Sequence, residues 1–150
     1  MRKERIKGKQ SKNTKNQSVL PKSINFIVGR VLPVLVFLGA GFFFAPYASM
    51  QFQNNDVKAL SNQAHTVMFY KSDCSHCQKA YPVVFWHNVF IFQQPDKQIQ
   101  TINVQNPNNA HYVADYQVQE TPTFMSIKNG SDRMVTTDKK QILNFAERDK

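Results

Sequence analysis

The sequence of 150 residues predicts an α/β domain, with a mixed central sheet flanked by helices, preceded by one transmembrane helix. Three observations predict this arrangement. An uncharged apolar run extends from Val31 to Tyr47, short β-prone runs alternate with helix-length segments beyond residue 64, and Asn129-Gly130 supplies a turn near the end. We expect a disordered basic tail (1–23), an anchor (24–47), a linker or short helix (48–64) and a folded domain (65–150).

The formal net charge of +9 is concentrated at the N-terminus, where nine Lys and Arg residues precede residue 31 and Glu4 is the sole acidic residue. Beyond residue 50 the acidic and basic residues nearly cancel. The charge therefore belongs to a tail and not to a groove on the domain, so that no nucleic-acid partner is expected. A basic arm that grips nucleic acid is the alternative interpretation.

The apolar run predicts a single-pass membrane anchor. Its uncharged part is at the short end of the roughly 17–25 residues that a spanning helix needs, and Arg30 can snorkel to extend it. A cleaved signal peptide and a buried core helix are the alternatives, but residues 45–48 (Ala-Pro-Tyr-Ala) fit a cleavage site poorly and the basic flank disfavours a core helix. An anchor or a signal peptide would leave the N-terminus in the cytoplasm and place the domain outside the cell membrane.

The elements of the domain follow from local pattern. Residues 66–70 predict a buried central strand, residues 98–105 alternate like a half-exposed strand, and residues 121–127 form a strand entered through Pro122. The run 80–92 has β-prone composition, but its length favours a buried helix kinked at Pro82. We expect residues 85–92 to be core, and the alternative is a groove wall beside the cysteine pair that takes apolar substrate segments. Further helices are expected over 106–116 and 138–146, and an antiparallel strand over 133–136 after the Asn129-Gly130 turn.

Cys74 and Cys77 are the only cysteines, and their Cys-x-x-Cys spacing places both in the first turn of a helix. The unpaired N–H groups and the dipole of a helix N-terminus favour a thiolate at the first position. Zinc binding would need two further ligands, and no second Cys pair or paired His motif is present, so that no metal is expected. An inert structural disulfide is the other alternative to a redox-active dithiol.

Four motifs in this order resemble the thioredoxin-fold family. They are Cys74-Ser-His-Cys77 after a strand, Pro82 five residues later, Asn106-Pro107 opening a helix, and Thr121-Pro122 before a strand. The resemblance implies that Cys74 is the exposed nucleophile, that Cys77 resolves the mixed disulfide, and that Pro122 is cis and faces both. It implies substrate contacts at Thr121 and Ser75, with no cofactor. His76 would favour the thiolate of Cys74, and the more oxidising family members carry histidine at this position. A solvent-exposed loop histidine without a role is the alternative.

The sequence also departs from thioredoxins. Met68 stands where they keep a buried aspartate, Gln100 replaces the nearby lysine, and Asp73 replaces tryptophan before the motif. We therefore expect a membrane-tethered extracytoplasmic thiol–disulfide oxidoreductase, nearer to an oxidase or isomerase than to a reductase. It would act on thiols and disulfides of exported proteins with an unknown redox partner. It resembles small membrane-anchored bacterial members that accompany bacteriocin export or conjugation, and a non-enzymatic accessory subunit of a secretion or transfer complex is the alternative.

Overall fold

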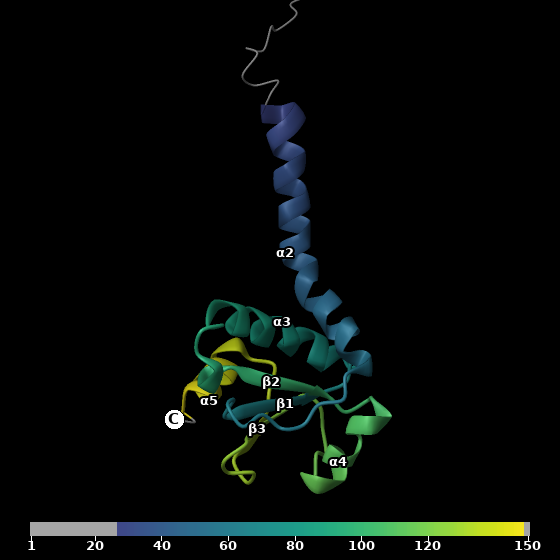
Figure 1. Ribbon diagram of the computed structural model, residues 1–150, viewed down its shortest axis with the longest axis vertical. Helices are drawn as coiled ribbons and strands as arrows, with labels where there is room; N and C mark the ends of the chain where they lie inside the picture. Colours follow the sequence, from purple (N-terminus) through teal and green to yellow (C-terminus); the bar gives the residue numbers. More distant parts are fainter. Residues whose placement is uncertain (1–26, 149–150) are drawn as a thin grey trace, which may run out of the picture. The chain divides into compact units, whose positions relative to one another are not determined.

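The computed structural model describes residues 27–148. Predictions for the tail (1–23) and for residues 24–26 of the anchor lie outside this range. The elements are η1 (Ile27–Val31), α2 (Leu32–Phe52), η2 (Gln53–Asn55), β1 (Thr66–Tyr70), α3 (Ser75–Phe90), η3 (Pro95–Lys97), β2 (Ile99–Asn103), η4 (Pro107–Asn109), α4 (His111–Asp115), β3 (Thr123–Ser126), β4 (Arg133–Val135) and α5 (Lys139–Arg148) (Figure 1). The predicted succession of strands and helices in the domain is confirmed.

The chain divides into two compact units after Gly39, and we describe each by itself. One helical stretch, Val28–Asn55, is long and apolar enough to cross a membrane, with a mean hydropathy of 2.0, and its most apolar window has no buried residue. The helix α2 does not end at Tyr47, where we expected the anchor to stop, but continues to Phe52. Pro46, inside the expected anchor, and Met50, beyond it, are both buried in the second unit.

The sheet is mixed and has the order β2-β1-β3-β4. β1 runs parallel to β2, with Met68 opposite Thr101, and antiparallel to β3, with Met68 opposite Phe124. β4 completes the sheet as an antiparallel neighbour of β3. The parallel pair requires a crossover, which contains α3, and the antiparallel pair β3–β4 is joined by a short loop.

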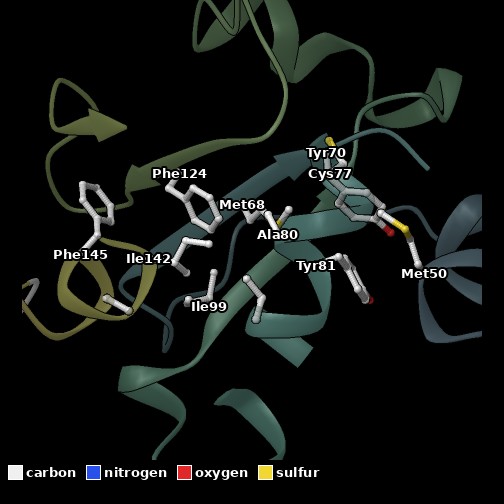
Figure 2. Packing of buried hydrophobic residues seen from close by; sticks show 12 residues of the cluster. Met50, Met68, Tyr70, Cys77, Ala80, Tyr81, Ile99, Phe124, Ile142 and Phe145 are labelled. Carbon is white, nitrogen blue, oxygen red and sulfur yellow. The ribbon is translucent and has the colours of Figure 1, made fainter. Parts of the chain in front are cut away.

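Two apolar clusters occupy the two faces of β1, because successive side chains of a strand point to opposite faces. Met68 and Tyr70 face the cluster formed with α3 and α5, which also contains Cys77, Phe124 and Met50 (Figure 2). The other cluster lies on the side of α4 and contains Val67, Phe69, Ile102, Val104, Tyr112, Val118 and Met125. α3 and α4 thus cover opposite faces of the sheet (Figure 1). The prediction of β1 as a buried central strand is confirmed.

The half-exposed character predicted for β2 is wrong. Thr101 and Asn103 are buried, because the chain that follows α2 lies against this edge strand and supplies partners for its polar side chains. Thr101 Oγ1 donates to Gln53 Oε1 at 2.9 Å, and Asn103 Nδ2 donates to Asn54 Oδ1 at 2.9 Å. This segment therefore covers a sheet edge that would otherwise be open to pairing with another chain.

Two further local predictions need correction. The turn between β3 and β4 has Gly130 and Ser131 at its centre, with the N–H of Asp132 donating to the carbonyl of Asn129 at 2.9 Å. No glycine within residues 27–148 has a positive φ, so the two-residue turn expected at Asn129-Gly130, which needs positive φ, does not form. The predicted helix α3 is confirmed, but the end of the 85–92 segment is not core, since Phe90 and Phe92 are exposed.

Candidate functional site

Cys74 lies at the N-terminal cap of α3. Its backbone is extended (φ −83°, ψ 120°), and its carbonyl accepts the first helical hydrogen bond, from the N–H of Gln78 at 3.0 Å. The side chain is half-buried, so that a macromolecule can reach the sulfur. The sulfur therefore lies at the positive end of the helix dipole, next to N–H groups that have no partner within the helix.

The environment of Cys74 favours its thiolate. Burial by itself would raise the pKa of this thiol, but hydrogen bonds to the sulfur outweigh that effect. They come first from the backbone of Cys77, then from the side chains of Thr121 and Cys77, and from the backbone of His76. The net result is a pKa of Cys74 below the ordinary value of a cysteine.

Cys77 has the opposite character. It is completely buried, in the cluster that contains Tyr70 and Ala80 (Figure 2). Burial raises the pKa of the Cys77 thiol to about 11, although a backbone hydrogen bond with Lys71 and the side chain of Thr121 act in the other direction. Cys77 is therefore protonated at neutral pH and out of reach of large molecules.

The Thr121-Pro122 segment faces the first cysteine. The Thr121-Pro122 peptide bond is cis, as expected from the resemblance. The Cys74 Sγ donates to the carbonyl oxygen of Thr121 at 3.3 Å, across 47 residues of sequence. Pro122 is buried directly before β3, whereas Thr121 is partly exposed. The structure thus brings together Cys74, Cys77, Thr121 and Pro122 from two separated segments.

Ser75 and His76, the other predicted site residues, occupy the first turn of α3 and are both exposed. The contribution of His76 to the lowered pKa of Cys74 comes from its backbone. Most substitutions of His76 would keep this backbone N–H donor. Any effect of the imidazole on Cys74 is therefore separate and has to be tested by substitution. Its exposure leaves it free to meet a bound substrate.

The sequence did not indicate how the loop before Cys74 is held. Ser72 Oγ donates to Gln105 Oε1 at 2.8 Å, and Gln105 Nε2 donates to Asp73 Oδ2 at 3.1 Å. From the helix side, Gln78 Nε2 donates to the carbonyl of Ser72 at 2.9 Å. Gln105 lies shortly after β2, the parallel neighbour of β1. That position was the one feature of the sequence that could have indicated a contact between Gln105 and the loop before Cys74.

Tyr70 is a second residue that sequence reasoning did not single out. It is fully buried at the end of β1 and packs on Tyr81, with ring centroids 5.1 Å apart. Burial raises the pKa of Tyr70, and the charges of Tyr81, Asp56 and Cys77 add to this effect. Together with Met68 it makes the surroundings of Cys77 mainly apolar, which accounts for the weak acidity of that thiol.

The pair can carry out thiol–disulfide exchange by its geometry: one accessible, acidic thiol and one buried, weakly acidic thiol lie within one helical turn. Within the described residues, no group of three His, Cys, Asp or Glu side chains is placed to hold a metal ion. The thioredoxin family model matches residues 45–148, more than half of the chain. The chain belongs to the thioredoxin family.

Membership of the thioredoxin family suggests thiol–disulfide oxidoreductase activity, although some family members are not enzymes. Among solved structures, thioredoxin of Fasciola hepatica is similar, with 23% sequence identity and a TM-score of 0.46, covering 57% of this chain and 79% of that one. No curated protein sequence matches the chain significantly. The family model and the sheet order together give the thioredoxin fold, and the chain also has an N-terminal helix that could span a membrane.

Proposed function

We propose that this thioredoxin-family protein is a membrane-tethered thiol–disulfide oxidoreductase that acts outside the cell membrane on exported proteins. The observation that carries the proposal is the asymmetry of the cysteine pair. The half-buried Cys74 has a lowered pKa, whereas the buried Cys77 has a pKa raised to about 11. An inert structural disulfide needs no such difference between its two sulfurs.

In the reducing direction, the Cys74 thiolate attacks one sulfur of a substrate disulfide. A mixed disulfide forms, and the other substrate sulfur leaves as a thiolate that takes up a proton. Cys77 then loses its proton and attacks Cys74 Sγ, so that the 74–77 disulfide forms and the second substrate sulfur leaves. The substrate gains two electrons and the pair loses two.

Run in reverse, the same steps oxidise a substrate dithiol, and a second thiol–disulfide couple must then restore the oxidised pair. We favour this direction. The lowered pKa of Cys74 stabilises the reduced pair, and a stabilised reduced form makes the disulfide an oxidant. Thr121 and Pro122 would hold an extended substrate segment against Cys74, because the Thr121 carbonyl is already within hydrogen-bonding distance of the sulfur.

The proposed location is supported by the apolar helix Val28–Asn55 and by the basic residues that precede it. Extracytoplasmic compartments also permit disulfides to persist. We place the protein with the small membrane-anchored bacterial members of the family that accompany bacteriocin export or conjugation, because the same combination of anchor and short domain occurs here.

The decisive test is trapping of mixed disulfides with a full-length Cys77→Ser variant in membranes. Attack on Cys74 cannot then be resolved, so exported proteins should accumulate on Cys74 and be released by reductant. Cys74→Ser is the matched control and should trap nothing. Full function of a Cys74→Ser, Cys77→Ser double variant in the cell would refute the enzyme and leave a non-enzymatic accessory subunit.

The direction of transfer has its own test. The full-length chain in detergent is equilibrated with glutathione buffers, and we expect a reduction potential well above about −270 mV, the value typical of thioredoxin. A potential at or below that of thioredoxin would remove the oxidant assignment while leaving the exchange chemistry intact.

A further inference from the structure

Aromatic side chains of α2 and α3 form one continuous cluster, which we call the aromatic patch and define as Phe42, Phe43, Trp86 and Phe90. Trp86 is half-buried at its centre, and the three phenylalanines are exposed. Phe42 stacks on Trp86, with centroids 3.8 Å apart and an interplanar angle of 19°. Phe43 contacts Phe42 edge-on at 6.1 Å, and Phe90 contacts Trp86 at 6.1 Å. Phe43 is 73% and Phe90 74% exposed, so that the patch presents its rings to the surroundings.

Apolar surface continues beyond the patch. Val89 and Phe92 are exposed next to Phe90 along the chain. A cavity of about 350 Å³ adjoins Trp86 and Phe90 and is lined mainly by apolar side chains, including Pro82, Val83 and Leu143. Exposed apolar surface of this kind marks a binding surface, because each ring left in water loses the free energy of burial, about 25 cal/mol per Å².

The occupant can be inferred from the position of Phe42 and Phe43. Both belong to the apolar helix that is long enough to cross a membrane. Trp86 is in direct ring contact with Phe42, so any placement of α2 that brings Phe42 to the lipid also brings Trp86 there. Tryptophan is enriched where hydrocarbon meets headgroups, because its ring is apolar and its indole N–H is polar.

We propose that the aromatic patch lies in the lipid–water interface of the outer leaflet and seats the thioredoxin domain on the membrane surface. The inference rests on the proposed membrane anchoring and goes beyond it, since a tether alone would leave α3 in water. The charge beside the cavity also agrees with a location among lipid headgroups. The exposed Lys139 lines this cavity together with Trp86 and Phe90, and its ammonium group can meet lipid phosphate there.

The proposed location of the aromatic patch in the interface is compatible with a reactive Cys74 thiol. Cys74 and Trp86 are separated by 12 residues, almost all within α3. At a rise of 1.5 Å per residue, the sulfur lies roughly 18 Å along the helix from the ring. Cys74 therefore lies outside the aromatic patch, and contact of Trp86 with lipid does not by itself cover the sulfur.

Trp86 is the only tryptophan in the chain, so its fluorescence reports on this surface alone. The full-length protein is reconstituted into phosphatidylcholine–phosphatidylglycerol vesicles whose acyl chains carry bromine at a shallow or at a deep position. We expect a blue-shifted emission and a loss of fluorescence that is larger with shallow bromine than with deep bromine. Phe90→Ser should reduce that loss, whereas Val135→Ser, an exposed apolar residue on β4, should not.

Flotation of the vesicles and resistance to alkaline extraction report on the anchor separately. In one outcome, the protein floats with the vesicles while Trp86 is quenched by aqueous acrylamide and not by brominated lipid. That result would refute the interfacial location of the aromatic patch and would leave the membrane anchor supported. A protein that does not float would overturn both. If Trp86 is shielded from both quenchers and the protein is a dimer by cross-linking, the patch binds a second copy and the lipid proposal is wrong. Circular dichroism of each variant confirms that it has folded.

Discussion

The asymmetry of the two cysteines predicts a large difference in their rates with a small disulfide reagent such as 5,5′-dithiobis(2-nitrobenzoate). The comparison uses two single-thiol chains in detergent, Cys77→Ser, which retains Cys74, and Cys74→Ser, which retains Cys77. A thiol with a pKa of about 11 is ionised at pH 7 to about one part in 10⁴, whereas an ordinary thiol with a pKa near 8.5 is ionised to about 3%. Ionisation alone thus favours an ordinary thiol over Cys77 by about 300-fold, and the lowered pKa of Cys74 acts in the same direction.

A more basic thiolate is intrinsically more nucleophilic, which reduces this advantage. With a Brønsted coefficient of about 0.4–0.5, a pKa difference of about 2.5 makes the Cys77 thiolate intrinsically roughly 10–18 times more nucleophilic than that of an ordinary thiol. Cys74 should therefore react roughly 17–30 times faster than Cys77 at pH 7, and the complete burial of Cys77 increases the ratio further.

The dependence on pH has opposite form for the two thiols. The rate of Cys74 should level off below the ordinary pKa of a cysteine, since its pKa is lowered, whereas the rate of Cys77 should keep rising up to about pH 11. In urea, both chains should react like an unstructured thiol. Equal rates at pH 7 in the folded chains, or a rate of Cys77 that levels off near pH 8.5, would refute the assignment of roles.

Three further outcomes are expected. Thr121→Val removes the hydroxyl that hydrogen-bonds both sulfurs and should raise the pKa of Cys74, as read from thiolate absorbance, whereas Thr121→Ser should leave it nearly unchanged. His76→Gln keeps the backbone N–H and should leave the reduction potential in glutathione buffers nearly unchanged, whereas a more reducing pair would show that the imidazole itself also favours the thiolate of Cys74. Met50→Ala should lower the free energy of unfolding by about 2–5 kcal/mol in urea titrations, because this side chain is buried in the core. The control Phe52→Ser, at an exposed position of the same helix, should change it by less than about 0.5 kcal/mol. Equal losses in the two variants would show that the end of α2 is not part of the core.

The sequence predicted those features that depend on local pattern. The run 66–70 indicated a buried strand, the cysteine spacing indicated a helix N-terminus, and Asp138 indicated the start of the last helix, where its side chain accepts from the N–H of Gln141 at 2.9 Å. The contact between Cys74 and Thr121 followed from the resemblance of several motifs in one order, and no single motif would have indicated it.

What the sequence did not predict depends on partners far along the chain. The alternation in 98–105 predicts one polar face in water, but Gln53 and Asn54 satisfy two of its polar side chains from 48 and 49 residues away. Periodicity reports which side chains share a face and not what covers that face. For the same reason, the aromatic run 85–92 was assigned to the core, although part of it faces outward beside α2.

If α2 anchors the chain as proposed, the position where this helix enters the domain determines how the chain responds to bilayer thickness. Phe43 and Phe44 are exposed, whereas Met50, less than two turns later and roughly 10 Å further along the axis, is buried in the domain. Sliding the helix by one turn to match a thinner or thicker hydrocarbon layer would withdraw Met50 from the core or leave both rings in water. In a chain anchored in this way, hydrophobic mismatch would be accommodated before Phe42, by tilt or by local deformation of the lipid, and the outer boundary of the span would be fixed to the fold.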